Sequence, residues 1–294
     1  PVIDEVEERP GQLCRAFYLR GREKFFGNIS VIAQAYPLSP RYGAEMMTTT
    51  DCGRCRNTPP ADFAITMAFQ PIIDSSTRSV FAYEALVRGA KGEGAGEVLS
   101  RVTEETRYSF DQQCRTKAIG QSVDLGMKTA ADKPFLSINF LPNAVYEPRA
   151  CIRQTLAIAM QTGFPLDRII FEFTEGEQID TDHLLNILRV YRSMGFATAI
   201  DDFGAGYAGM NLLAEFQPDF VKLDMNLIRD IDQNQPKQVI VKGILDIAAQ
   251  LGVRPICEGI ETLAEFETLQ SYGVELMQGY FFARPALDAL PPID

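Results

Sequence analysis

From residue 67 onward, short apolar runs rich in β-branched and aromatic residues alternate with longer amphipathic stretches. This alternation predicts strands joined by helices, the βα pattern of a parallel sheet. The expected strands are Ala68–Ile73, Val80–Val87, Phe135–Phe140, Ile169–Phe173, Ala197–Ile200, Phe220–Leu223, Arg254–Cys257 and Leu276–Phe281. The expected helices are Gln113–Gly126, Ala150–Thr162, Asp182–Met194, Met210–Glu215, Lys237–Leu251 and Thr262–Ser271.

Several of the expected helices end at a glycine, a residue that adopts the left-handed conformation at a helix C-terminus at little cost. These glycines are Gly126, Gly163, Gly195, Gly252 and Gly273. Short strands with intervening helices predict an α/β fold, a TIM-like (β/α)8 barrel, which typically needs about 250 residues. The chain, with 294 residues, is long enough. The link between the first two strands is too short for a crossover helix, so we expect an antiparallel first strand.

Residues 1–66 lack this alternation and contain several prolines and only short apolar stretches. We assign them to an N-terminal extension or small subdomain of unknown role, and residues 67–294 to the barrel. Cys52 and Cys55 form a CxxC pair, but a structural zinc site would need two further ligands, so the pair alone indicates no function. The glycine-rich stretch Gly89–Gly96 is expected to be a flexible connection.

Composition excludes several classes of function. The formal net charge of −11 repels polyanions and argues against a nucleic-acid polymer as partner. No apolar run approaches the ~20 residues of a membrane-spanning helix, and the cysteines lie mostly in apolar or helical stretches, as reduced thiols do. We therefore expect a cytoplasmic protein. His183 is the only histidine, which excludes a His-rich zinc site and any mechanism that needs two imidazoles.

Acids, amides and a lysine lie at the ends of nearly all the expected strands, where barrel enzymes place their chemistry. They are Glu84, Asn139, Glu172, Asp201, Asp202, Lys222, Glu258 and Gln278. Taken singly, such residues have ordinary explanations: an aspartate can cap a helix, and Lys222 could pair with Asp224. Together they predict a cation site, because several acids that converge on one barrel mouth would otherwise repel one another.

Carboxylate and amide oxygens without imidazole or thiolate favour Mg²⁺ or Mn²⁺, and less often Ca²⁺. Two such ions ~3.5–4 Å apart activate water for an in-line displacement at phosphorus. A phosphoester also needs positive side chains, which Lys222 and Arg88 could supply, since Arg88 lies on the same strand face as Glu84. The residues alone leave open a different metal-dependent barrel enzyme, such as a lyase acting on an enolisable acid.

Longer motifs occur in a fixed order along the chain. They are Gln70-Pro71-Ile72, Glu84-Ala85-Leu86-Val87-Arg88, Ile138-Asn139, Phe171-Glu172-Phe173-Thr174-Glu175, Asp201-Asp202-Phe203-Gly204-Ala205-Gly206-Tyr207, Val221-Lys222-Leu223-Asp224, Glu258-Gly259-Ile260-Glu261-Thr262 and Gln278-Gly279-Tyr280-Phe281. In this order, from about Met67 to Pro285, the chain closely resembles the EAL domain family, the cyclic-di-GMP-specific phosphodiesterases of bacteria. A lone Glu-Ala-Leu would mean nothing, whereas the ordered set is very specific.

The resemblance implies a TIM-like barrel with an antiparallel first strand and a role for each site residue. One metal ion would be held by Glu84, Asn139, Glu172 and Asp201. Asp201 would bridge to a second ion, held also by Asp202 and Glu258. Lys222 would orient or polarise the attacking water. Substrate would be bound by Gln70, Leu86, Arg88 and Gln278, of which Gln278 would also help to order the water and metal shell. Glu175 would anchor the loop Asp202–Tyr207.

The resemblance further implies hydrolysis of cyclic di-GMP to linear pGpG with two Mg²⁺ or Mn²⁺ ions, inhibition by Ca²⁺, and a homodimer. Degenerate family members have typically lost one of the acids that this chain keeps, namely Glu84, the Asp201-Asp202 pair and Glu258. We therefore expect an active enzyme, with a non-hydrolysing cyclic-di-GMP receptor as the alternative.

Two departures from the family pattern leave the ligand set intact. Phe140 follows Asn139 where the family usually has a small hydroxyl residue. Ala205, Ala208 and Gly209 stand where the family loop commonly has Thr and Ser. Both changes bear on the behaviour of the loops, and so on activation and dimer coupling, more than on the chemistry.

Overall fold

The computed structural model describes residues 58–174, 180–206 and 209–293. Most of the expected N-terminal extension, including Cys52 and Cys55, lies outside the described residues. Glu175 and Tyr207 also lie outside them. The domain boundary after residue 66 stays a prediction, and the first described strand, β1 (Ile65–Asp74), begins just before it.

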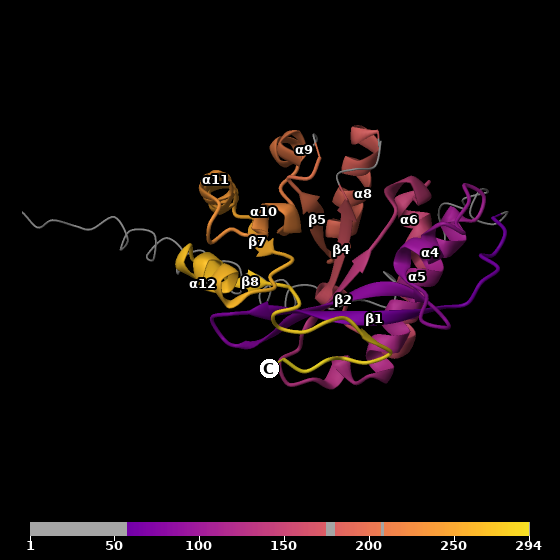
Figure 1. Cartoon of the computed structure of the whole chain (residues 1–294). Coiled ribbons are helices and arrows are strands. Elements are labelled where there is room, and N and C mark those ends of the chain that lie inside the picture. Colours follow the sequence, from indigo (N-terminus) through magenta and orange to yellow (C-terminus); the bar gives the residue numbers. More distant parts are fainter. Residues whose placement is uncertain (1–57, 175–179, 207–208, 294) are drawn as a thin grey trace, which may run out of the picture. The chain divides into compact units, whose positions relative to one another are not determined.

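The strands form a closed barrel (Figure 1). They are β1 (Ile65–Asp74), β2 (Ser79–Gly89), β3 (Phe135–Asn139), β4 (Ile169–Thr174), β5 (Ala197–Phe203), β6 (Phe220–Leu223), β7 (Arg254–Cys257) and β8 (Leu276–Met277). From β2 through β8, each strand is hydrogen-bonded to the next strand in the sequence. Strand β8 then pairs with β1, and β1 pairs with β2, which closes the ring. A short strand, β9 (Ala286–Leu287), adds to β1. The TIM-like barrel expected from the sequence is confirmed.

Strand β1 is antiparallel to both of its neighbours in the ring, whereas the pairs from β2 to β8 are parallel. A short turn joins β1 to β2, and the Asp74 side chain accepts hydrogen bonds from the backbone N–H groups of Ser76 and Thr77 there. Arg78 ends the turn in the left-handed region, at a φ of 55°. The expected antiparallel first strand is confirmed, because so short a link admits no crossover helix.

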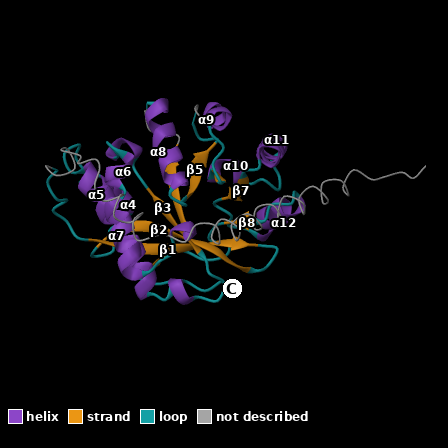
Figure 2. Cartoon of the chain, turned by 180° about the vertical axis from the view of Figure 1, so that it is seen from behind, coloured by secondary structure: helices purple, strands orange, loops and turns teal. Residues whose placement is uncertain are grey.

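Helices surround the strands (Figure 2). Those described are α4 (Ala95–Leu99), α5 (Arg107–Asp124), α6 (Pro148–Cys151), α7 (Arg153–Thr162), α8 (Thr181–Ser193), α9 (Gly209–Glu215), α10 (Met225–Ile228), α11 (Gln235–Leu251) and α12 (Leu263–Ser271). The glycines expected at the helix ends all have positive φ: Gly126, Gly163, Gly195, Gly252 and Gly273. Within the described part of the chain, none of the helices has the length and apolarity needed to cross a bilayer.

The structure differs from the sequence expectations at three places. The expected connection Gly89–Gly96 is a loop only as far as Gly94, because helix α4 begins at Ala95. Helix α10 follows β6 directly and is not expected from the sequence. Strand β8 ends at Met277 and not at Phe281, because the chain turns at Gln278 and Gly279 to pack against the segment that follows β7.

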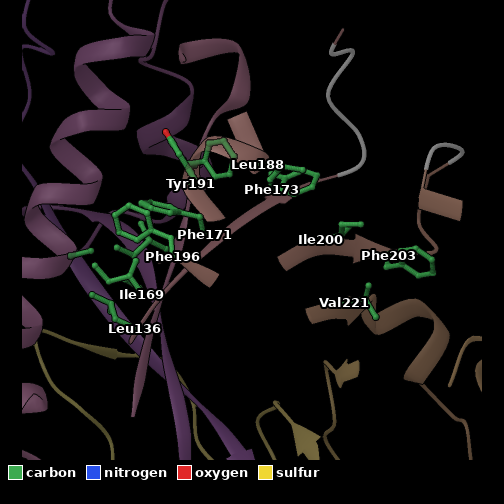
Figure 3. Packing of buried hydrophobic residues seen from close by; sticks show 14 of the residues in the cluster. Leu136, Ile169, Phe171, Phe173, Leu188, Tyr191, Phe196, Ile200, Phe203 and Val221 are labelled. Atoms are coloured by element: carbon green, nitrogen blue, oxygen red, sulfur yellow. The ribbon is translucent and has the colours of Figure 1, made fainter. Parts of the chain in front are cut away.

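Alternation along the strands sends side chains to two cores. One core lies between the barrel and the helices, and Figure 3 shows part of it, with Phe171, Phe196 and Tyr191 gathered beside β4. The other joins residues from nearly every strand and so lies inside the barrel; we call it the apolar floor. Its buried members are Ile72, Ala82, Ile170, Ala199, Phe220, Ile256 and Leu276.

Candidate active site

A layer of polar side chains lies two positions beyond the apolar floor on each strand. Because side chains in a strand alternate between faces with a period of two, a residue two positions from a floor residue also points into the barrel. Glu172 follows Ile170 in this way, and Asp201 follows Ala199. The layer comprises Gln70, Glu84, Ser137, Glu172, Asp201, Lys222, Glu258 and Gln278. The barrel thus collects at one end the side chains that the sequence places near its strand ends.

Lys222 is the centre of this layer. Its Nζ lies 2.7 Å from a carboxylate oxygen of Glu258, 2.8 Å from Glu172, 3.0 Å from Asp201 and 3.5 Å from Glu84. The ammonium is 1% exposed, so these ion pairs are shielded from bulk water. The alternative pairing with Asp224 is wrong, because β6 ends at Leu223 and the Asp224 side chain caps α10 by accepting from the Asn226 backbone N–H at 2.9 Å.

Amide and hydroxyl groups orient two of the acids. Asn139 Nδ2 donates to Glu84 Oε1 at 3.0 Å, and Gln278 Nε2 donates to Glu84 Oε2 at 2.8 Å. The Ser137 hydroxyl donates to Glu172. Ser137 is missing from the residues expected from the sequence, although its place two positions before Asn139 puts it on the same face of β3.

Two groups of three acids meet at Asp201. Oxygens of Glu84, Glu172 and Asp201 lie within 4.8 Å of one another, and so do oxygens of Asp201, Asp202 and Glu258. Neighbours in a regular strand point to opposite faces, yet Asp201 and Asp202 both reach this cluster. The reason is local: the β5–β6 register shifts between Ile200 and Phe203, and Asp202 has a φ of 54°. A bulge with a left-handed residue breaks the alternation and redirects one side chain.

Among the described residues, the cluster holds five carboxyl groups around a single ammonium group, and burial together with this charge imbalance shifts the pKa values of Asp202, Glu172, Glu258 and Lys222. Burial and the charge of Asp201 raise the pKa of Asp202 to about 6. Burial also raises the pKa of Glu172 and of Glu258, with further contributions from nearby acids. Burial opposes the charge of Lys222, but the four carboxylates outweigh it and hold the pKa of the ammonium well above its usual value.

The donor set fits hard divalent cations. All candidate ligands offer oxygen, and the described part of the cluster contains no imidazole or thiolate. Gln278 Oε1 is buried and accepts no hydrogen bond from any described group, so it is available to a metal-bound or substrate-bound donor. Oxygen ligands of this kind suit Mg²⁺, Mn²⁺ or Ca²⁺, which would also offset the excess negative charge.

The raised pKa of Asp202 predicts how stability depends on pH. Its value of about 6 in the fold exceeds its ordinary value of 3.8, so between those limits this carboxyl binds more protons in the metal-free native state than in the unfolded chain. Its contribution to the stability of the fold should therefore fall as pH rises from about 4 to about 6. Divalent ions displace these protons, so Mn²⁺ should raise the melting temperature at least ~3 °C more at pH 8 than at pH 5. The protein is first stripped of metal with EDTA, and Mn²⁺ is then added at each pH. Equal rises in melting temperature at pH 5 and pH 8 would contradict this prediction.

The expected substrate-binding residues contact the cluster unequally. Gln70 lies opposite Glu84 across the β1–β2 pair, and its Nε2 donates to the Ala283 carbonyl at 3.3 Å. Leu86 and Arg88 are half-buried further along β2. Arg88 Nη1 donates to its neighbour's carbonyl, that of Val87, at 2.8 Å and makes no ion pair with a described carboxylate. The structure thus places Gln70 opposite Glu84 and bonds Gln278 to it, whereas the described hydrogen bond of Arg88 goes to the backbone of β2.

Gly279 lets the segment with Gln278 approach the segment after β7. A Cβ atom at Gly279 would lie 2.0 Å from the backbone oxygen of Ile260. We expect Gly279→Ala to destabilise the protein by about 1–3 kcal/mol, because backbone on both sides must shift. Gly120→Ala is the matched control, since its Cβ meets nothing within 4 Å and helix α5 should gain ~0.5–1 kcal/mol. Urea unfolding checks both; equal midpoints would contradict the packing argument.

The model of the EAL domain matches residues 61–285. The chain belongs to the EAL domain family. A crystal structure of a standalone versatile EAL protein from Vibrio cholerae O395, in its c-di-GMP-bound form, shares 52% identity and a TM-score of 0.76. That match covers 79% of this chain and 97% of the Vibrio chain. The manganese and cyclic-di-GMP complex of Klebsiella pneumoniae BlrP1 at pH 9.0 shares 35% identity and a TM-score of 0.71, over 76% of this chain and 56% of that one.

Two curated relatives of this EAL domain have different roles. The blue light- and temperature-regulated antirepressor BluF of Escherichia coli K12 is 32% identical over 230 residues, 77% of this chain and 55% of BluF. A cyclic di-GMP phosphodiesterase of Pseudomonas aeruginosa is 32% identical over 142 residues, 48% of this chain and 24% of that protein. The chain thus spans about half or less of these relatives, which include both an enzyme and an antirepressor.

Proposed function

We propose that this EAL domain hydrolyses cyclic di-GMP to linear pGpG with the help of two divalent metal ions. The observation that carries the proposal is the pair of acid groups that share Asp201 around the buried Lys222. A receptor that only binds cyclic di-GMP has no need of so many uncompensated buried acids. Solved relatives bind this dinucleotide, one of them together with manganese, which supports the choice of ligand and of cation class.

In this proposal the acids divide between two ions as expected from the sequence. Glu84, Asn139, Glu172 and Asp201 would hold the first, and Asp201, Asp202 and Glu258 the second. When bound, Mg²⁺ or Mn²⁺ would lower the pKa of water and neutralise charge at phosphorus. Ca²⁺ prefers more ligands and looser geometry, so we expect it to bind without supporting turnover.

The chain's own residues would orient the reactants. Lys222 Nζ, with its proton held by four carboxylates, would donate a hydrogen bond to the attacking water and fix its position. Gln278 would order the water and Glu84 together, since its Nε2 already donates to Glu84 and its Oε1 accepts no hydrogen bond from the described residues. Arg88, Gln70 and Leu86 would contact the dinucleotide at the mouth.

The deciding experiment is incubation of the purified chain with cyclic di-GMP and Mn²⁺ or Mg²⁺, with EDTA as control, followed by chromatography. Metal-dependent formation of pGpG is expected. The similarity to BluF, an antirepressor, supports a second candidate function, a non-hydrolysing receptor that regulates a partner protein. Tight binding of intact cyclic di-GMP without product would support the receptor and refute the enzyme.

We also propose that the active form is a homodimer, in the cytoplasm. Helix α11 carries large apolar side chains that face solvent, with Val239 65% and Ile240 50% exposed, a pattern typical of contact surfaces. Ile240→Glu should weaken self-association at least ~10-fold by placing charge in that contact, about 1.4 kcal/mol. Ala249→Glu, at an exposed position elsewhere on α11, is the control. Analytical sedimentation measures this self-association, and a wild type that is monomeric and fully active would refute the proposed dimer.

A further inference from the structure

A buried ion pair lies outside the barrel, behind β3 and β4. Arg115 of α5 is 0% exposed, and its Nη2 lies 2.7 Å from Asp111 Oδ2, one helical turn before it. Its Nη1 donates to the hydroxyl of Tyr191, on α8, at 2.7 Å. Fully buried arginines are rare, because their desolvation is costly unless partners surround them.

The same guanidinium contacts the two strands at the point where they deliver candidate ligands. Its carbon lies 5.2 Å from the ring centre of Phe140 and 5.0 Å from that of Phe171. Phe140 directly follows Asn139, and Phe171 directly precedes Glu172. Since strand neighbours point to opposite faces, the two rings turn outward onto Arg115 while Asn139 and Glu172 turn into the barrel.

Hydrogen bonds complete this link. Asp111 Oδ1 accepts from the Leu141 backbone N–H at 2.9 Å, which fixes the chain just after Asn139. The Phe140 N–H donates to the Glu172 carbonyl at 2.9 Å, which ties the two strand ends to each other. Figure 3 shows Phe171 and Tyr191 side by side in this outer core, and their ring centres are 5.0 Å apart.

We propose that Arg115, paired with Asp111, is a positioning residue that sets the spacing of Asn139 and Glu172 for a divalent cation. This inference rests on the proposed metal-dependent function. A guanidinium stacked on one ring from each strand, and anchored through Asp111 to the backbone beyond β3, restricts both strand ends at once. Groups behind the ligands of a metal site typically change metal affinity or activity 10–100-fold when removed.

The test separates positioning from stability. Arg115→Met leaves Asp111 buried without its partner and should destabilise the fold, so its effect alone would be ambiguous. The double variant Asp111→Asn, Arg115→Met removes both charges and keeps similar volume, and a neutral pair of this kind often restores stability. Arg168→Met is the matched control, because Arg168 also supports β4, at its opposite end, by donating to the Pro134 and Met127 carbonyls.

Mn²⁺ binding is measured by calorimetry on EDTA-treated protein without substrate, beside melting temperature and hydrolysis. We expect the double variant to melt near the wild type but to bind Mn²⁺ at least ~10-fold more weakly, with high Mn²⁺ recovering most of its turnover. Arg168→Met should lose stability and keep its Mn²⁺ affinity. Wild-type affinity in the double variant would overturn the positioning role.

The wild type distinguishes this inference from the proposed function. A wild type that binds Mn²⁺ but forms no pGpG refutes the enzyme and leaves the positioning role to be decided by the Mn²⁺ titrations. A wild type that binds no Mn²⁺ overturns the positioning role, since there is then no cation for Asn139 and Glu172 to hold.

Discussion

Replacing Glu84 with alanine is expected to lower the turnover of cyclic di-GMP by on the order of 10³-fold or more, about 4 kcal/mol in the barrier. Glu84 supplies one of the three carboxylates of the first acid group. It is also the acceptor for Asn139 Nδ2 and Gln278 Nε2. The substitution therefore removes a proposed charged ligand and releases two amides that would otherwise stay in place.

The fold should survive this change, because the cluster then has one fewer negative charge to bury. We expect the melting temperature of the metal-free protein to change little, as relief of repulsion offsets the lost hydrogen bonds. Mn²⁺ affinity should fall together with turnover. Glu267→Ala, at an exposed position on α12, is the control and should leave all three quantities unchanged. Turnover near the wild-type rate in Glu84→Ala would refute the role of Glu84 as a ligand.

The barrel and the candidate ligands could be predicted because both depend on strand periodicity. Glu172 between two phenylalanines, and Lys222 between Val221 and Leu223, cannot face the outer core, so they must point inward. Short elements held by tertiary contacts could not be predicted. Helices as short as α4 and α10 have almost no intrinsic stability. Asp224 caps α10, but an aspartate after a strand occurs in many other settings and so does not by itself predict a helix.

The ion pair behind the site escapes sequence reasoning for a related reason. A charged residue on an amphipathic helix is normally solvated, so the sequence gives no reason to expect Arg115 and Asp111 to be buried. Only the packing of α5 and α8 against β3 and β4 shows that both are buried. Ser137 is different: it is missing from the residues expected from the sequence, although its place two positions before Asn139 puts it on the same strand face, and the strand period alone would have found it.

The second large effect is expected from Lys222→Met. The ammonium is the only described cation within 4 Å of the acids, and it lies within 3.0 Å of three of them. Removing it leaves several buried carboxylates without a counter-charge, a change that typically costs about 3–5 kcal/mol. The melting temperature of the metal-free protein should therefore fall by about 6–20 °C. Lys117→Met, at an exposed position on α5, should change it little.

Metal ions should repair the stability of Lys222→Met but not its chemistry. Divalent cations that bind the folded acids, as proposed, would stabilise the fold by mass action, about 2.7 kcal/mol at a concentration 100 times the dissociation constant. They supply no N–H donor to hold the attacking water, so pGpG formation should stay at least ~10²-fold below the wild type. Melting curves and turnover with and without Mn²⁺ separate the two effects. Recovery of both would reduce Lys222 to a counter-charge, whereas recovery of stability alone gives it a part in the reaction.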